Sequence, residues 1–354
     1  METRELLSGK SRMTGATRRE LLAALILTGL VAGACSGADD DQSSQQGESA
    51  GFTNPVVDAN LPDPMIIADD SGGWWAFATN GNGANIQTLR STDLITWEQA
   101  PDALPQLPAW TAGGDVWAPE VARADDGRWL LYYTTPAPED RGDIQCVGLA
   151  IADSPGGPYV DSSDGPLVCE TEDGGTIDAH PFTAPDGKRY LYWKNDGNRI
   201  GVDTWISVQG LDPSGTELVG EPTKLIKQDQ AWEGSLIEAP FVVEASGTYW
   251  LFYSANAYDS ADYAVGVARA SGPTGPFTKQ PDPVLVSNEV AAGPGHCSLF
   301  TAGDRPWMVY HAWAPDSVGS VIPGRTMWLS EVQVSADTVS VTPPATSYPN
   351  RPLG

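Results

Sequence analysis

Three acidic residues stand before or inside apolar runs, where an ionisable side chain is unusual. Asp63 occurs in "NLPDPMII", Asp178 in "TIDAHPF" and Glu238 in "SLIEAPFVV". If the three carboxyl groups meet in one partly desolvated place, mutual repulsion and burial raise the pKa of at least one of them. Hydrolysis of a glycosidic bond requires such a split, with a protonated carboxyl group as acid and an ionised one as base or nucleophile. The alternative is that these acids cap turns or bind a cation, because Asp before Pro is a common turn signal.

A repeat of five segments indicates how acids so far apart in the sequence could meet. Each segment contains a small or Pro-containing turn, an apolar strand, a Gly-containing hairpin and an aromatic-rich strand. The segments cover residues 63–80, 118–135, 179–196, 239–256 and 295–313. Aligned on one residue each, they recur at intervals of 55 to 62 residues; the residues are Pro64, Pro119, Pro181, Pro240 and Cys297.

Units of this length with roughly four short strands are the size of a propeller blade. The sequence therefore predicts an all-β chain, with a five-bladed β-propeller over residues 52–342 and a C-terminal tail over 343–354. The alternative is a β-sandwich or a two-domain β protein. In a propeller the innermost strand of every blade lines the central channel, so residues at matching repeat positions converge. We therefore expect Asp63, Asp178 and Glu238 to be neighbours around the axis.

The first 34 residues are typical of an export signal. Arg18 and Arg19 precede an apolar run over 21–34, which is too short for an ordinary membrane-spanning helix and ends in small residues before Cys35. This lipobox-like pattern predicts cleavage before Cys35 and lipidation of that cysteine. A plain secretory signal is the alternative, and "TRRELL" resembles a weak twin-arginine signal. Polar residues 35–51 would then be a flexible linker, and the protein would be secreted or anchored by lipid at the outer face of the cell membrane.

The formal net charge of −26 argues against partners that need basic patches, namely nucleic acids and anionic membrane surfaces. A membrane contact is expected only through the lipid anchor. Of the cysteines after the signal, Cys146 and Cys169 could form a disulfide in an oxidising compartment, which would leave Cys297 free and buried. No cysteine spacing resembles a zinc site.

Five motifs in order give the chain a resemblance to a known family. They are "NPVVDANLPDPMII", "DVWAPEV", "GTIDAHPFTAPDGKRYLYW", "LIEAPFVVEASGTYWLFYSAN" and "GPGHCSLF". Together they resemble the pattern of glycoside hydrolase family 43 over nearly the whole chain after the signal. The resemblance implies a five-bladed propeller that inverts the anomeric centre and acts mainly on arabinofuranosyl or xylosyl linkages. The chain departs from the family in having Ala239 where a glycine is common.

The resemblance also implies a role for each of the three acids. Asp63 matches the general base that activates water, Glu238 matches the general acid, and Asp178 matches the third acid, which tunes the proton donor and orients the substrate. The residues next to Glu238 in the sequence are apolar, so we expect its neutral form to be favoured near neutral pH.

Four further residues are candidates for binding the sugar. Trp117 shares the repeat position of the acids and could form an apolar wall under the ring, or fill the gap between blades; Phe182 is a weaker candidate of the same kind. The resemblance implies that His296 lies deep in the channel, where it could hold water or a structural cation such as calcium. It also implies that Arg325 reaches the sugar hydroxyls; the alternative is a surface ion pair. No cofactor is expected to be required.

The predicted function is hydrolysis of α-L-arabinofuranosyl linkages in plant cell-wall polysaccharides or oligosaccharides derived from them, by a monomer. A β-xylosidase of the same family is the nearest alternative. Five-bladed fructan hydrolases retain configuration and would show "NDPNG", "RDP" and "EC" signatures, which do not occur here. A sugar-binding propeller without catalysis is a further alternative, which the loss of an acid would favour.

Overall fold

The computed structural model describes residues 51–137 and 144–353. The predicted signal over 1–34, the lipidation site Cys35 and all but the last residue of the predicted linker therefore lie outside the described residues. Among the residues that the structure does describe, no helix is both long and apolar enough to cross a membrane.

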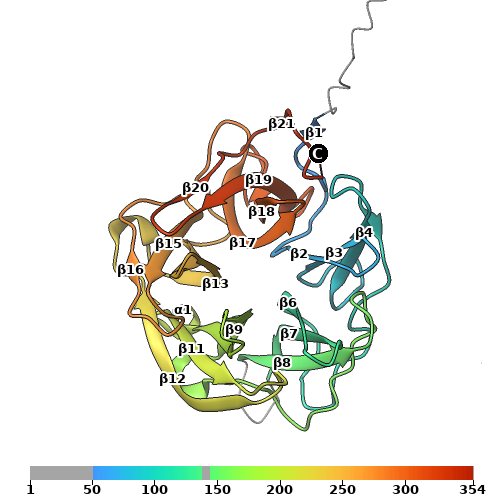
Figure 1. Cartoon of the computed structure of the whole chain (residues 1–354), viewed down its shortest axis with the longest axis vertical. Coiled ribbons are helices and arrows are strands. Elements are labelled where there is room, and N and C mark those ends of the chain that lie inside the picture. The colour runs from blue at the N-terminus through green and yellow to red at the C-terminus, as the bar shows by residue number, and fades with distance from the viewer. Residues whose placement is uncertain (1–50, 138–143, 354) are drawn as a thin grey trace, which may run out of the picture. The chain divides into compact units, whose positions relative to one another are not determined.

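Five antiparallel sheets follow one another around a central axis, which confirms the predicted five-bladed β-propeller (Figure 1). The first blade consists of β2 (Met65–Ala68), β3 (Trp74–Ala78), β4 (Gln87–Ser91) and β5 (Glu98–Gln99). The second consists of β6 (Trp117–Arg123), β7 (Trp129–Pro136) and β8 (Gln145–Ala152). The third consists of β9 (Thr176–Thr183), β10 (Arg189–Asn195), β11 (Trp205–Leu211) and β12 (Leu218–Lys227).

The fourth and fifth blades complete the ring with four strands each. The fourth consists of β13 (Ile237–Ala245), β14 (Thr248–Ala255), β15 (Ala264–Ala270) and β16 (Thr278–Lys279). The fifth consists of β17 (Ala292–Ala302), β18 (Arg305–Trp313), β19 (Thr326–Val334) and β20 (Val339–Val341). Helix is limited to the single turn α1 (Gly197–Ile200) and the 3₁₀ turns η2 (Thr171–Asp173) and η3 (Ala231–Glu233) within the described part of the chain. In every blade the first strand lies innermost (Figure 1).

The second blade has three strands among the described residues, where the repeat predicts about four. The segment that follows β8 forms no regular strand beside it among the described residues and pairs with it through isolated bridges, such as Val147 with Val168 and Ile151 with Val160. That segment contains Pro155, Pro158 and Pro166, and proline has no N–H to donate to a ladder. The outer edge of this blade is therefore irregular.

Five apolar clusters fill the spaces between neighbouring blades. The cluster between the first and second blades contains Phe77 and Tyr133, for example, and the cluster between the fifth and first contains Trp74 and Phe300. The second strands of the blades are buried on both faces, because each blade is packed between two others. This position explains why an aromatic-rich run recurs in every repeat.

A short two-stranded sheet joins the two ends of the propeller. β1 (Phe52–Thr53) pairs antiparallel with β21 (Ser347–Tyr348), which lies in the segment predicted as a tail. The ring of Tyr348 stacks on Phe52 with centroids 5.0 Å apart and also packs against Trp307 of the fifth blade. The last residues of the chain thus pair with the first described ones and help to close the ring.

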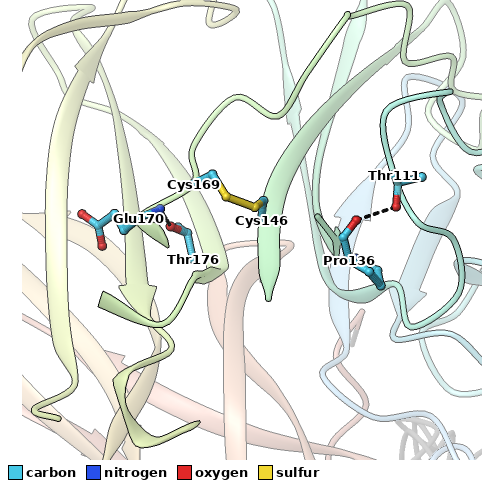
Figure 2. Close-up of a disulfide and its surroundings, with 6 residues drawn as sticks. All are labelled: Thr111, Pro136, Cys146, Cys169, Glu170 and Thr176. Atoms are coloured by element: carbon cyan, nitrogen blue, oxygen red, sulfur yellow. Dashed lines mark hydrogen bonds between the residues drawn. A yellow bond between two sulfur atoms is a disulfide. The ribbon is translucent and has the colours of Figure 1, made fainter. Parts of the chain in front are cut away.

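One disulfide ties β8 of the second blade to the segment that leads into the third blade. Cys146 in β8 is bonded to Cys169, which lies just before β9, and Figure 2 shows the bond spanning the two segments. Next to it the N–H of Glu170 donates a 2.8 Å hydrogen bond to Oγ1 of Thr176. Cys297 is free and buried. The predicted pairing of the cysteines is confirmed.

Candidate active site

One backbone feature marks the start of the innermost strand of every blade. A non-glycine residue adopts a positive φ there, which is rare outside glycine. The five residues are Asp63 (55°), Ala118 (43°), Asp178 (57°), Ala239 (52°) and His296 (46°). These are equivalent positions, so the residue of the third repeat that matches Pro64 is Ala179. The sequence alignment on Pro181 was wrong by two residues, because that proline lies further along β9.

A ring of hydrogen bonds between blades holds these five positions around the axis. Each of the five backbone N–H groups donates to a side chain of the blade before it. The pairs are Ala118 to Thr79 (2.9 Å), Asp178 to Thr134 (3.3 Å), Ala239 to Asp178 (2.9 Å), His296 to Ser254 (2.8 Å) and Asp63 to His311 (3.1 Å). The ring satisfies backbone donors that the left-handed turns take out of the strand ladders.

A cavity of about 520 Å³ opens among these positions. Its lining includes all three acids, together with three of the predicted sugar-binding residues: Asp63, Asp178, Glu238, Trp117, His296 and Arg325. Residues from five blades that are far apart in the sequence therefore meet in one place, as the repeat predicts.

Phe182 does not line this cavity, so its predicted place at the sugar was wrong. Its ring packs edge-on against Tyr192 and Tyr249, at centroid distances of 6.4 and 5.9 Å. Phe182 lies four residues beyond Asp178 on β9, past the turn that faces the cavity, and its side chain belongs to the apolar cluster between the third and fourth blades.

Asp63 is an ionised carboxylate held by several donors. Nη1 of Arg325 and Nδ1 of His296 lie 2.9 and 3.4 Å from its Oδ1, and the hydroxyl of Thr79 donates to its Oδ2. Burial alone would raise the pKa of Asp63, but Arg325 and His296 hold it well below its ordinary value of 3.8.

His311 is a neutral histidine beneath Asp63. The backbone N–H of Asp63 donates to its Nδ1, so the ring proton belongs on Nε2. Burial, with the charge of Arg325, lowers the pKa of His311 to about 4. Its ring lies parallel to that of Tyr263, with centroids 5.6 Å apart. The neutral imidazole thus positions the backbone of Asp63.

Asp178 holds a proton more readily than an ordinary aspartate. Burial raises its pKa to about 6; the negative charge of Glu238 also raises it, while His296 and Lys194 act in the opposite direction. Its Oδ2 accepts the hydrogen bond from the N–H of Ala239. The split that the sequence predicts is therefore present, with Asp63 ionised and Asp178 protonatable near neutral pH.

Glu238 lies among polar groups, which differs from the surroundings inferred from its sequence neighbours. The hydroxyl of Tyr263 donates to its Oε1 at 2.7 Å, and Nζ of Lys194 lies 3.5 Å from its Oε2. The neighbouring Ile237 is fully buried in the cluster between the third and fourth blades, because side chains alternate along β13. The side chain of Ile237 therefore packs between the blades and not against the carboxyl group of Glu238.

Arg325 and two aromatic residues form the walls on which a sugar could rest. The guanidinium of Arg325 lies 4.4 Å from the ring centroid of Tyr258, and both residues line the cavity. Tyr258 is 48% exposed, and Trp117 is half-buried on the lining. The alternative of a surface ion pair is thus excluded for Arg325, because its partner is Asp63 inside the cavity.

His296 faces Asp63 and takes part in the ring of hydrogen bonds. Its Nδ1 faces Oδ1 of Asp63, and its backbone N–H belongs to the ring. Across the described ranges, no group of three or more His, Cys, Asp or Glu side chains is placed to hold a metal ion.

Sequence reasoning missed Lys194 and Tyr263, both of which contact Glu238. A signal existed for Lys194, since it interrupts the apolar run "YLYWKND" just as Glu238 interrupts its own. Tyr263 stands just before β15, where nothing in the repeat marks it as a partner of Glu238. Thr79 and His311 were also missed as members of the ring.

The arrangement suits acid–base chemistry on a bond placed between the carboxyl groups. An ionised carboxylate, Asp63, can take a proton from water. Across the cavity, Asp178 and Glu238 form a pair in which one carboxyl group can hold a proton and deliver it.

A family model and a solved structure both match this chain to the same family of glycoside hydrolases. A family model described as "Glycosyl hydrolases family 43" matches residues 52–339, which begin at β1 and end in β20. Among solved structures, a thermostable family-43 glycoside hydrolase superposes with a TM-score of 0.77 at 30% identity, covering 85% of this chain and 99% of that one.

Several curated relatives are also similar over most of the chain. The β-D-galactofuranosidase xynD of Aspergillus niger is 28% identical, with 73% of this chain and 75% of the relative covered. An extracellular exo-α-(1→5)-L-arabinofuranosidase of Streptomyces avermitilis is 27% identical, with 74% and 56% covered. A β-xylosidase of Bacillus subtilis is 25% identical, with 73% and 49% covered. The chain thus spans about half the length of the latter two.

Proposed function

Because the chain belongs to glycosyl hydrolases family 43 and is a glycosidase, we propose that it cleaves α-L-arabinofuranosyl linkages with inversion at the anomeric carbon. The substrates would be plant cell-wall polysaccharides or oligosaccharides derived from them. The observation that carries the proposal is the meeting of Asp63, Asp178 and Glu238 in one cavity with their charge states split.

Each acid has a proposed role. Asp63, kept ionised by Arg325 and His296, acts as general base and takes a proton from the attacking water. Glu238 acts as general acid and protonates the departing sugar oxygen. Asp178 tunes the proton affinity of Glu238 through its nearby charge and helps to orient the sugar. An inverting reaction of this kind needs a water molecule between base and sugar, so the two working carboxyl groups stand on opposite sides of the bond.

Binding of the sugar is assigned to the cavity walls. Trp117 offers an apolar face to the ring, and Arg325 offers guanidinium donors to the hydroxyls while holding Asp63. His296 lies beside Asp63 and can hydrogen-bond a hydroxyl or the attacking water.

The names of the relatives support a furanosyl substrate. Two of the three curated relatives described above are named for furanosides, one galactofuranosyl and one arabinofuranosyl. A second candidate is β-xylosidase activity, which the name of the third relative supports.

Hydrolysis of a panel of aryl glycosides tests the proposal. The aryl α-L-arabinofuranoside should be cleaved fastest, ahead of the β-D-xyloside and the β-D-galactofuranoside, and NMR of the first product should show the inverted anomer. Fastest cleavage of the xyloside would favour the second candidate. A protein that binds arabinan oligosaccharides but releases no sugar would overturn the enzymatic proposal in favour of a sugar-binding propeller.

We also propose that no metal ion is needed for activity. The donors around His296 do not make up a metal site within the described residues. Dialysis against a chelator should leave the rate of hydrolysis unchanged; a loss that calcium restores would contradict this.

The proposed location is outside the cytoplasm, with the chain anchored by a lipid on Cys35. Relatives named as extracellular enzymes support export, although their names say nothing of an anchor. Mass spectrometry of the mature N-terminus tests this: a diacylglyceryl-modified Cys35 is expected, and a free N-terminus at another residue would contradict it.

A further inference from the structure

Lys194 occupies an exceptional position in the ring of inter-blade hydrogen bonds. In each blade, the residue just before the left-handed position pairs with one residue of the second strand. Those second-strand residues are Thr79, Thr134, Lys194, Ser254 and His311. Four of them accept the N–H of the next blade, whereas an ammonium group has no acceptor to offer.

The missing acceptor on Lys194 changes what Asp178 does. The N–H of Ala239 would otherwise be buried without a partner, which is costly. Oδ2 of Asp178 accepts it instead, at 2.9 Å. One oxygen of the Asp178 carboxyl group is therefore fixed by the residue that follows Glu238.

The ammonium group of Lys194 is saturated within the protein. Its Nζ lies 2.6 Å from Oδ1 of Asn198, 3.3 Å from Oδ1 of Asp196 and 3.5 Å from Oε2 of Glu238. The side chain is 1% exposed, although it lines the cavity. Three N–H donors thus have three acceptors, and none is left for a sugar hydroxyl. Lys194 acts on Glu238 and not on the substrate.

We propose that Lys194 is a positioning residue that sets how Asp178 and Glu238 share their proton. Its charge faces Oε2 of Glu238. Because Lys194 has no acceptor, the N–H of Ala239 donates to Asp178 instead. The inference deepens the proposed function and rests on it for the roles of the two acids.

The other charged groups around the pair come from several blades. Those facing Asp178 and Glu238 are Asp196 from the third blade, Tyr263 from the fourth, His296 from the fifth, and Asp63 with its partner Arg325. Of the two limbs of a pH profile of kcat/KM, the basic limb reports loss of the proton from the acid, and the acidic limb reports protonation of the base. Lys194 contacts Glu238 and does not contact Asp63, so its removal should move the basic limb.

Three substitutions separate charge from shape. Lys194→Met removes the charge at similar volume, Lys194→Thr installs the residue type of the first two blades, and Lys194→Arg keeps the charge. The Met and Thr variants should shift the basic limb to higher pH by about one unit or more, because two charges at such a distance interact by that much. The acidic limb should move less, and the Arg variant should shift neither limb by as much.

Lys279→Met is the matched control. Lys279 is also a buried lysine held by carboxylates, those of Asp229 and Glu233 at 2.8 and 2.7 Å, but it does not line the cavity. Its loss should lower the melting temperature without moving either limb. A purely structural role for Lys194 predicts the same pattern for Lys194→Met and Lys194→Thr, and that result would overturn the inference.

A failure of the proposed function can be distinguished from a failure of the inference about Lys194. If the wild-type chain cleaves no glycoside, carboxyl titration by NMR of ¹³C-labelled Asp and Glu replaces the kinetic readout. The titration midpoint of Asp178 should rise in Lys194→Thr relative to wild type. An unchanged midpoint would refute the role of Lys194 whatever the enzyme does. Lys194→Thr serves if Lys194→Met fails to fold, since Thr is a native residue of the ring.

Discussion

The backbone N–H of Ala239 donates a 2.9 Å hydrogen bond to Oδ2 of Asp178. Ala239 directly follows Glu238, so this bond couples the carboxyl group of one blade to the chain segment that carries the carboxyl group of the next. Neither acid can change its position without disturbing the other. The positive φ of Ala239 turns its N–H toward the third blade and makes the bond possible.

The stability of the protein should depend on pH through Asp178. Its pKa is raised from 3.8 to about 6 in the folded state, so its protonated form favours folding. This contribution is fully present below about pH 4 and is lost as the pH rises through 6. At about 1.4 kcal/mol per pKa unit, the loss is about 3 kcal/mol.

Asp178→Asn should remove that dependence, because the amide is neutral at every pH and its oxygen can still accept from Ala239. The free energy of unfolding of the variant, measured by urea titration, should exceed that of wild type increasingly from pH 4 to pH 7. A difference that stays constant over this range would contradict the raised pKa of Asp178.

Glu238→Gln should abolish most hydrolysis while leaving sugar binding intact. The amide cannot donate a proton to the leaving oxygen, and general acid catalysis is typically worth about 10²- to 10⁴-fold. The rate on an aryl arabinofuranoside and the affinity for an arabinan oligosaccharide give the two readouts. Glu244→Gln, the same change further along β13 and away from the cavity lining, is the control and should keep the rate. Equal rates of hydrolysis for both variants would show that Glu238 is not the general acid.

The repeat predicted both the propeller and the meeting of the three acids, because in a ring of blades the residues at matching repeat positions lie close together around the axis. It did not predict the alignment of the third repeat, which depends on the local turn. Proline served as the marker in the alignment, but the feature common to all blades is the left-handed residue, which sequence spacing does not display. Phe182 was misplaced because it lies beyond that turn, four residues after Asp178 on β9.

Side chains that reach the acids and Arg325 from the connecting segments could not be predicted from the repeat. Tyr263 reaches Glu238 from the segment between β14 and β15, and Tyr258 reaches Arg325 from the same segment. The length and course of such connections vary from blade to blade. The charge state of Asp178 also needed coordinates, since it results from burial and from distances to other charges.

Arg325→Met should move the acidic limb of the pH profile to higher pH. Loss of the guanidinium 2.9 Å from Oδ1 of Asp63 removes a strong cause of the low pKa of that acid, so the base becomes protonated at a higher pH. A shift of about one unit or more is expected. Arg90→Met is the control: Arg90 also lies over an aromatic ring and beside an aspartate, but outside the cavity lining. A wild-type acidic limb in Arg325→Met would show that the arginine does not set the state of the base.

Loss of the disulfide should destabilise the protein without unfolding it at room temperature. The bond between Cys146 and Cys169 closes a loop with a sequence separation of 23, for which chain entropy predicts about 3 kcal/mol. The double variant Cys146→Ser and Cys169→Ser should melt at a lower temperature than wild type, and a reducing agent should lower the melting temperature of wild type alone. Insensitivity of wild type to the reducing agent would be evidence against the bond.

Tyr348→Ala should strongly lower the free energy of unfolding, because Tyr348 is a buried side chain of the two-stranded sheet formed by β1 and β21. The ring of Tyr348 is 4% exposed, stacks on Phe52 and contacts Trp307, and its hydroxyl lies 3.0 Å from Oγ of Ser330. Truncation of a buried aromatic residue costs about 3–5 kcal/mol, whereas Tyr348→Phe removes only the hydrogen bonds of the hydroxyl and should cost about 1 kcal/mol. Urea unfolding of both variants measures the difference. If the Ala variant lost no more than the Phe variant, the last residues would be a dispensable tail, and the propeller would be closed by the contact of its first and fifth blades alone.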